Sequence, residues 1–174
     1  MDARTDTPPD TASVARSYFE AIGRRDLDSM TDHWEPGGTG EIHGLVELEA
    51  PDTYREWFGN LFQAFPDFRF EILDLVAEGE QAAVRWRASG TFNGSTHFEG
   101  VAPNGAQVDL TGCDLLTIRN GRIHRNEAYM NGAEMGRQLG ALPPTGSLTE
   151  RAMLGALNAR TAGAGLMQRL RSRE

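Results

Sequence analysis

The chain has 174 residues, of which 39% are hydrophobic and 24% charged, as expected for one globular domain with an ordinary core. A formal net charge of −8 argues against nucleic acid as a partner, and no apolar run approaches the length of a membrane span. The single cysteine, Cys113, excludes an intrachain disulfide.

The first half of the chain carries helical patterns. The polar residues 1–10 lack the apolar core of a signal peptide, so we expect a flexible N-terminus and a cytoplasmic protein. The run Glu35-Pro36-Gly37-Gly38 breaks the second helix, and a short extended piece is expected at residues 40–43. The spacing of apolar residues predicts three amphipathic helices, over residues 11–22, 26–34 and 51–64.

From residue 68 the apolar period changes to two, which indicates strands. A long glycine-rich connection, residues 93–105, separates the second predicted strand from the third. Helices followed by a meander predict an α+β fold, with three N-terminal helices packed on a curved antiparallel sheet and a cavity between them. The predicted strands cover residues 68–77, 81–92, 107–118 and 122–130.

The C-terminal residues 144–174 read as a helical extension beyond a domain of residues 11–143. Ser147 and Glu150 form a capping box, which predicts a helix from there to about Arg160. The small residues of 161–165 are expected to interrupt it before a second short helical turn at residues 166–171.

The chain lacks the residues or motifs that several common types of catalysis and cofactor binding require. The chain contains no lysine, so a lysine Schiff base and a Walker-type phosphate loop are both excluded. No serine stands in a GxSxG elbow, and the four histidines show none of the common metal-ligand spacings. We therefore expect neither a metal nor another cofactor.

Asp114 is the most informative polar residue of the predicted sheet. It shares a strand face with apolar residues, among them Leu110 and Leu116. A carboxylate on such a face must be paired, hydrogen-bonded or protonated, because burying a bare charge is costly. Asp114 is thus either a functional acid/base group or a residue near a strand end that reaches water or a backbone N–H.

The order of elements and several short motifs resemble the SnoaL-like polyketide cyclases, within the nuclear transport factor 2-like superfamily that also holds ketosteroid isomerase. The resemblance covers about residues 11–143 and implies a cone-shaped α+β fold and a homodimer. The superfamily hosts many reactions, so the fold does not settle function. The motifs are Phe65-Pro66-Asp67, Val84-Arg85-Trp86, Gly90-Thr91, Phe98-Glu99-Gly100, Pro103-Asn104-Gly105, Gly121-Arg122-Ile123 and Arg137-Gln138-Leu139-Gly140.

The resemblance to ketosteroid isomerase implies two site residues. The tyrosine of that enzyme's oxyanion hole falls on Tyr18, and its protonated aspartate falls on Asp114. Its general base falls near Ile42, which cannot accept a proton. The neighbouring His43 is the alternative base that the resemblance implies.

The cyclases carry a Trp and then an acid/base Asp after the last hairpin, whereas this chain has Glu127 and Asn131 there. An asparagine cannot transfer protons as a carboxylate does. Glu127 either points into the cavity beside Asp114, where it would raise one carboxyl pKa, or pairs with an arginine such as Arg125.

Three hypotheses follow from these residues. The first is an enzyme that binds an apolar carbonyl compound, with Tyr18 and Asp114 donating hydrogen bonds to the enolate oxygen and His43 or Glu127 moving the proton. The second is epoxide opening by Asp114 and Glu127, and the third is a binding or scaffold protein without catalysis. The expected substrate contacts are Trp34, Trp57, Phe62, Trp86, Tyr129 and Asn131, although aromatic residues at such spacing often belong to a core.

Overall fold

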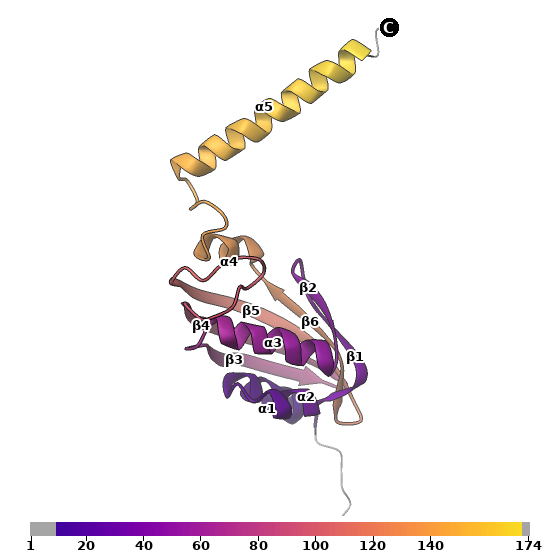
Figure 1. Ribbon diagram of the computed structural model, residues 1–174. Coiled ribbons are helices and arrows are strands. Elements are labelled where there is room, and N and C mark those ends of the chain that lie inside the picture. The colour runs from indigo at the N-terminus through magenta and orange to yellow at the C-terminus, as the bar shows by residue number, and fades with distance from the viewer. Residues whose placement is uncertain (1–9, 172–174) are drawn as a thin grey trace, which may run out of the picture.

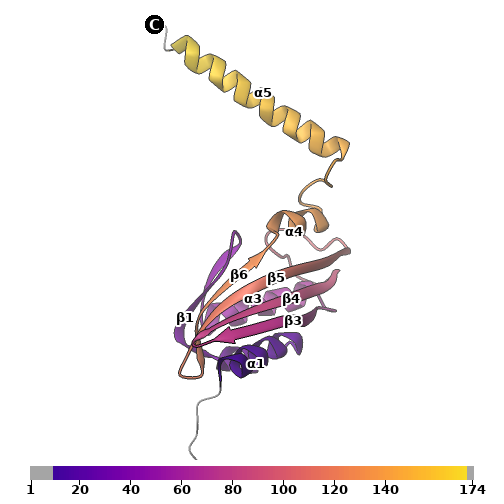
Figure 2. The same ribbon diagram turned by 180° about the vertical axis from the view of Figure 1, so that it is seen from behind.

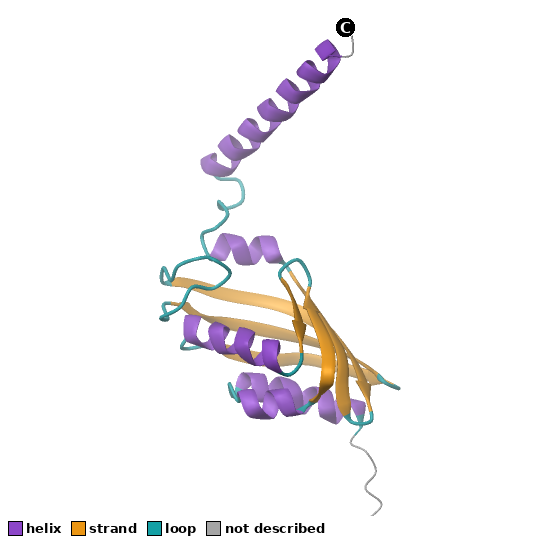
Figure 3. Ribbon diagram, turned by 45° about the vertical axis from the view of Figure 1, so that its right-hand side comes forward, coloured by secondary structure: helices purple, strands orange, loops and turns teal. Residues whose placement is uncertain are grey.

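The computed structural model describes residues 10–171, with the backbone alone for residues 162–171. The predicted flexible N-terminus lies almost wholly outside the described residues. Two layers make up the domain: helices cover one face of a single curved sheet, and the last helix extends away from it (Figures 1 and 3). The helices are α1 (Thr11–Gly23), α2 (Leu27–Asp32), α3 (Asp52–Ala64), α4 (Gly132–Gln138) and α5 (Leu148–Arg171).

The sheet has six strands in the order β2-β1-β6-β5-β4-β3. All neighbouring strands run antiparallel except β1 and β6, which are parallel, so the expected antiparallel sheet is in fact mixed. Figure 2 shows the face of the sheet that lies away from α1 and α3. The strands are β1 (Trp34–Ile42), β2 (Val46–Glu49), β3 (Arg69–Glu78), β4 (Gln81–Phe92), β5 (Ala106–Arg119) and β6 (Arg122–Met130).

Local signals explain the helix beginnings. Asp10 caps α1 by accepting a hydrogen bond from the Ser13 amide at 2.8 Å. Asp26 caps α2 in the same way through Ser29, at 3.0 Å. The buried face of α1, which includes Tyr18 and Phe19, packs on β3, β4 and β5. The helices thereby form one wall of the interior, and the sheet forms the other.

The N-terminal strand region differs from the sequence-based prediction. The second helix ends at Asp32 rather than Trp34, and Trp34 begins β1, so the strand includes the Pro36-Gly37-Gly38 stretch that was expected to be a break. The register between β1 and β6 shifts within this stretch, which accommodates the proline at an irregular point of the ladder. The expected extended piece at residues 40–43 is thus the end of a longer strand.

Two glycines permit close packing inside the domain. A side chain at Gly40 would place its Cβ 1.5 Å from the Tyr54 hydroxyl, and one at Gly112 would come within 2.3 Å of the Trp86 ring. Larger residues at these positions are therefore incompatible with the observed positions of Tyr54 and Trp86.

The C-terminal region contains two further differences. The short helix α4 was not predicted, and α5 continues through residues 161–165, where an interruption was expected. The Ser147–Glu150 capping box is present, because the Glu150 amide donates to the Ser147 hydroxyl at 3.1 Å. Within the described part of the chain, no helix is both long and apolar enough to cross a membrane.

Candidate functional site

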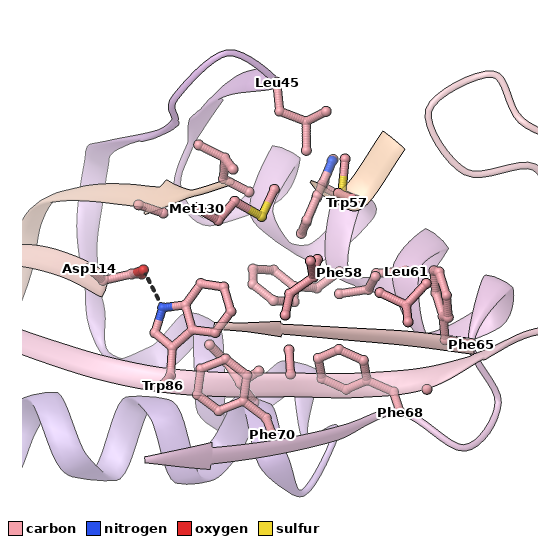
Figure 4. A pocket seen from close by; sticks show the side chains of 18 of the residues that line it. Leu45, Trp57, Phe58, Leu61, Phe65, Phe68, Phe70, Trp86, Asp114 and Met130 are labelled. Atoms are coloured by element: carbon pink, nitrogen blue, oxygen red, sulfur yellow. Dashed lines mark hydrogen bonds between the residues drawn. The ribbon is translucent and has the colours of Figure 1, made fainter. Parts of the chain in front are cut away.

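A pocket with a cavity volume of about 110 Å³ lies between the helices and the inner face of the sheet. Concave, mostly apolar places between packed elements are the usual sites of small-molecule ligands. Figure 4 shows that aromatic and aliphatic side chains make most of its wall, with Asp114 at one end. The wall includes Phe19, Leu45, Trp57, Phe58, Leu61, Phe65, Phe68, Phe70, Trp86, Phe98, Leu110 and Met130.

Asp114 is the carboxylate of this wall. It projects inward from β5 and is 5% exposed. The Trp86 indole N–H donates to its Oδ1 at 2.7 Å, and the Asn126 amide donates from Nδ2 to its Oδ2, also at 2.7 Å (Figure 4 shows the first bond). Gly112 opposes Trp86 across the β4–β5 ladder, and the absent side chain leaves room for the indole to reach Asp114. Each carboxylate oxygen therefore has one fixed N–H donor.

Burial raises the pKa of Asp114 to about 6, while the hydrogen bonds from Asn126 and Trp86 oppose the rise. A carboxyl group with that pKa is mostly ionised at neutral pH and accepts a proton readily. Two N–H donors also fit an ionised carboxylate better than a protonated one. The geometry thus favours Asp114 as a proton acceptor rather than as the protonated donor expected from ketosteroid isomerase.

Two tyrosines line the pocket near Asp114. Tyr18 comes from α1 and Tyr54 from α3, and both are buried. Burial is the main reason that the pKa of each phenol lies well above its usual value, and the negative charge of Asp114 adds to the rise. Both phenols therefore stay protonated, and they can donate hydrogen bonds to a ligand oxygen.

The structure brings four predicted site residues to the pocket: Tyr18, Asp114, Trp57 and Trp86. Trp57 is anchored from outside by a 3.0 Å hydrogen bond from its indole to Glu99, on the connection that precedes β5. Because Phe98 also lines the pocket, this connection forms part of the pocket wall.

Trp34 and Phe62, which were expected to contact substrate, belong to the core instead. The Trp34 ring packs against Tyr54 at a centroid distance of 4.2 Å, behind the pocket wall. The Phe62 ring packs between those of Phe58 and Phe68. Each residue supports side chains that line the pocket without lining it itself.

Glu127 and Tyr129 project from the opposite face of the sheet. His124 is an extra residue in β6, a β-bulge that lets both Ile123 and Asn126 point inward. The alternation after the bulge therefore turns Glu127 outward, where Arg125 donates to it at 3.0 Å. The expectation that Glu127 could stand beside Asp114 is wrong, and its pairing with an arginine is observed.

His43 also lies on this outer face, since Ile42 points into the pocket and Ala128, its partner on β6, does too. Its ring stacks on Tyr129 at 4.2 Å and contacts Glu41 and Glu127. The His43 base expected from the resemblance therefore has no path to Asp114 across the sheet. Glu41, His43 and Glu127 form a group with metal-ligand chemistry on this outer face.

Asn131 has a structural role at the beginning of α4. Its side chain caps α4 by accepting a hydrogen bond from the Glu134 amide at 3.0 Å. It does not line the pocket, so neither of the two departures from the cyclase pattern after the last hairpin, Glu127 and Asn131, acts there.

Tyr54 and Asn126 are polar residues of the pocket wall that were not predicted as site residues. Tyr54 was recognised only as part of an apolar helix stripe, and its polar end gave no separate signal. Asn126 was not singled out as a site residue, because the bulge at His124 that turns it inward is not evident from the sequence. Asn126 is 4% exposed, and its Oδ1 is a buried acceptor without a hydrogen-bond partner among the described residues.

Comparisons with known proteins agree with this architecture. The family model of the SnoaL-like polyketide cyclases matches residues 12–139. A search of curated protein sequences found no match.

Solved structures share the fold at low identity. AclR from Streptomyces galilaeus, a proposed hydroxylase, has a TM-score of 0.69 at 22% identity, covering 91% of this chain and 98% of its own. A proposed SnoaL-like polyketide cyclase from Jannaschia sp. CCS1 has a TM-score of 0.69 at 20% identity, covering 82% and 100%. IdmH from Streptomyces antibioticus, a proposed polyketide cyclase, has a TM-score of 0.64 at 23% identity, covering 76% and 99%.

Proposed function

Because the chain belongs to the SnoaL-like polyketide cyclase family, we propose that it closes a ring in an apolar, carbonyl-bearing small molecule by acid/base catalysis. One observation carries the proposal. A buried carboxylate, Asp114, stands at the end of an otherwise apolar pocket with two protonated phenols, Tyr18 and Tyr54, in the same wall. Enolate chemistry needs this combination of a base and hydrogen-bond donors.

The reaction begins when Asp114 takes a proton from the carbon next to the substrate carbonyl. The electron pair of the broken C–H bond moves into the carbonyl and leaves an enolate, whose oxygen accepts hydrogen bonds from Tyr18 and Tyr54. The enolate carbon then forms a bond to a second carbonyl carbon of the same molecule. The new alkoxide recovers the proton from Asp114, so the cycle leaves the enzyme unchanged.

The apolar wall contributes in two ways. It binds the hydrocarbon part of the substrate and keeps water from Asp114, which sustains the raised pKa of that carboxyl group. The shape of the wall also holds the substrate in a folded conformation, with its two reacting carbons close together. This contribution does not depend on any polar group.

The alternative of epoxide opening by a carboxylate pair receives no support from the pocket. Asp114 is the one carboxylate among the described residues that line it, and Glu127 is on the other side of the sheet. A single carboxylate cannot protonate the epoxide and activate the nucleophile at the same time.

Proton abstraction is tested without knowing the natural substrate. The probe is 2-tetralone, an apolar bicyclic ketone, whose α-hydrogens exchange for deuterium in heavy water and are followed by NMR. We expect wild-type protein to accelerate exchange, and Asp114→Asn to lower the protein-dependent rate at least a hundredfold. Tyr18→Phe and Tyr54→Phe should each lower it by about tenfold or more, because each removes one donor to the enolate oxygen.

The matched controls are His43→Ala and Glu127→Gln, which change the outer face and should leave the exchange rate within a factor of two. If these variants abolish exchange while Asp114→Asn retains it, the proposed base is wrong. If wild-type protein binds 2-tetralone and does not accelerate exchange, the third hypothesis, a binding protein without catalysis, replaces the cyclase.

A further inference from the structure

A second polar group lies on the outer face of the sheet, where β1 and β6 run side by side. Glu41 and Glu127 are direct neighbours in the parallel register, and Glu47 on β2 is the antiparallel neighbour of Glu41. Three glutamates thus form one row across three strands. Like charges directly opposite one another in a sheet are destabilising, so a cation at this row would be favourable.

His43 adds an imidazole to this row. Its Nδ1 lies 2.8 Å from Glu41 Oε1, and its Nε2 faces Glu127. The ring is also held by stacking on Tyr129 at 4.2 Å. A carboxylate beside the second ring nitrogen is common around a metal-ligating imidazole, and Glu41 stands in that place.

The distance between His43 Nε2 and the Glu127 carboxylate is the second feature of this group. The Nε2 atom is buried without a hydrogen-bond partner among the described residues, and it lies 3.7 Å from Glu127 Oε1. That separation is too long for a hydrogen bond. Two ligand atoms each about 2.1 Å from one metal ion are about 3.4 to 3.7 Å apart at angles of roughly 110° to 125°. The gap therefore matches the span of a shared transition-metal ion.

We propose that His43 Nε2 and Glu127, with Glu41 as the orienting carboxylate or a third ligand, bind a divalent transition-metal ion such as Zn²⁺ on the outer face. The ligand atoms of the three residues lie within 4.8 Å of one another. An imidazole with carboxylates selects Zn²⁺, Co²⁺ or Ni²⁺ over Mg²⁺ and Ca²⁺, which prefer oxygen ligands alone. Water molecules would complete the coordination.

Arg125 is the competitor of the metal at this site. It donates to the same oxygen, Glu127 Oε1, at 3.0 Å. A bound ion must share or displace that contact, so the arginine lowers the affinity for metal. This site is independent of the proposed catalytic pocket, because Glu41, His43 and Glu127 are on the other side of the sheet from Asp114.

The test is a titration of the full-length, tag-free protein with Co²⁺, followed by visible absorption, and competition of the bound Co²⁺ with Zn²⁺. We expect one ion per chain with absorption bands that differ from those of aqueous Co²⁺. His43→Ala and Glu127→Gln should each weaken binding at least tenfold, and Arg125→Gln should strengthen it several-fold.

The matched control is His124→Ala. His124 pairs with Glu35 on the surface but has no second carboxylate in the cluster, so its removal should leave binding unchanged. Wild-type protein that binds no Co²⁺ up to about 1 mM would overturn the proposal. So would binding that survives His43→Ala, since the ion would then be held elsewhere. Thermal unfolding of each variant without metal shows whether the fold is intact.

Discussion

Replacing Asp114 by asparagine should stabilise the protein while removing its activity. Burial raises the pKa of Asp114 from an ordinary 3.8 to about 6. A carboxyl group whose pKa is higher in the folded than in the unfolded state favours folding most below pH 3.8, and that contribution is lost as the pH rises through 6. At pH 7 the ionised group therefore costs about 3 kcal/mol relative to its unfolded state.

The asparagine variant has no buried charge at position 114, so this cost is absent. Both hydrogen bonds that Asp114 accepts, from Trp86 and Asn126, have counterparts in the variant. Trp86 can still donate to the new side-chain oxygen. A rotation of the Asn126 amide brings its Oδ1, which has no partner in the described structure, opposite the new NH₂ group. We therefore expect the Asp114→Asn variant to be about 2 to 3 kcal/mol more stable than wild type at pH 7.

Urea unfolding of both proteins at pH 4.5 and pH 7 measures this effect. The advantage of the variant should be larger at pH 7 by about 2 kcal/mol, because wild-type Asp114 is mostly protonated in the folded state at pH 4.5. Comparing two proteins at each pH cancels the contributions of the other titrating groups. A variant that is less stable than wild type at pH 7, or a difference that does not change with pH, would refute the reasoning.

Three further outcomes follow from the packing and the surface. Gly40→Ala should cost about 1–3 kcal/mol of unfolding free energy and slow 2-tetralone exchange, because the new methyl group displaces Tyr54; thermal unfolding and NMR measure the two effects. Gly155→Ala, in open space on α5, is its control and should raise stability by up to about 1 kcal/mol without changing exchange. We propose that the outer sheet face forms a homodimer, since Leu115 and Tyr129 are 43% and 44% exposed there. Leu115→Asp should then yield a monomer by light scattering, and a wild-type monomer at micromolar concentration would contradict this.

The sequence predicted the architecture because the period of the apolar residues is strong in α1, α3 and the regular strands. Asp114 is a clear example. β5 alternates without interruption from Val108 to Ile118, so counting in twos places Asp114 on the buried face, as observed. The position of one residue on a regular strand is a local property and can be derived from local sequence.

The same counting failed on β6 and at the start of β1. The bulge at His124 inverts the alternation, so that Asn126 replaces Glu127 in the interior. The strand that begins at Trp34 is held by pairing with β6, nearly ninety residues later in the chain, rather than by local preference. Both features depend on contacts between distant segments, which periodicity within one segment does not contain.

The central claim is that Asp114 is the base that removes the substrate proton, and a pH–rate profile tests it most directly. The rate of 2-tetralone exchange catalysed by wild-type protein should rise about tenfold per pH unit at low pH and level off above a midpoint near 6, where Asp114 is ionised. The Asp114→Asn variant should show no such rise. A wild-type midpoint near 4, or a midpoint near 6 that persists in Asp114→Asn, would contradict the account.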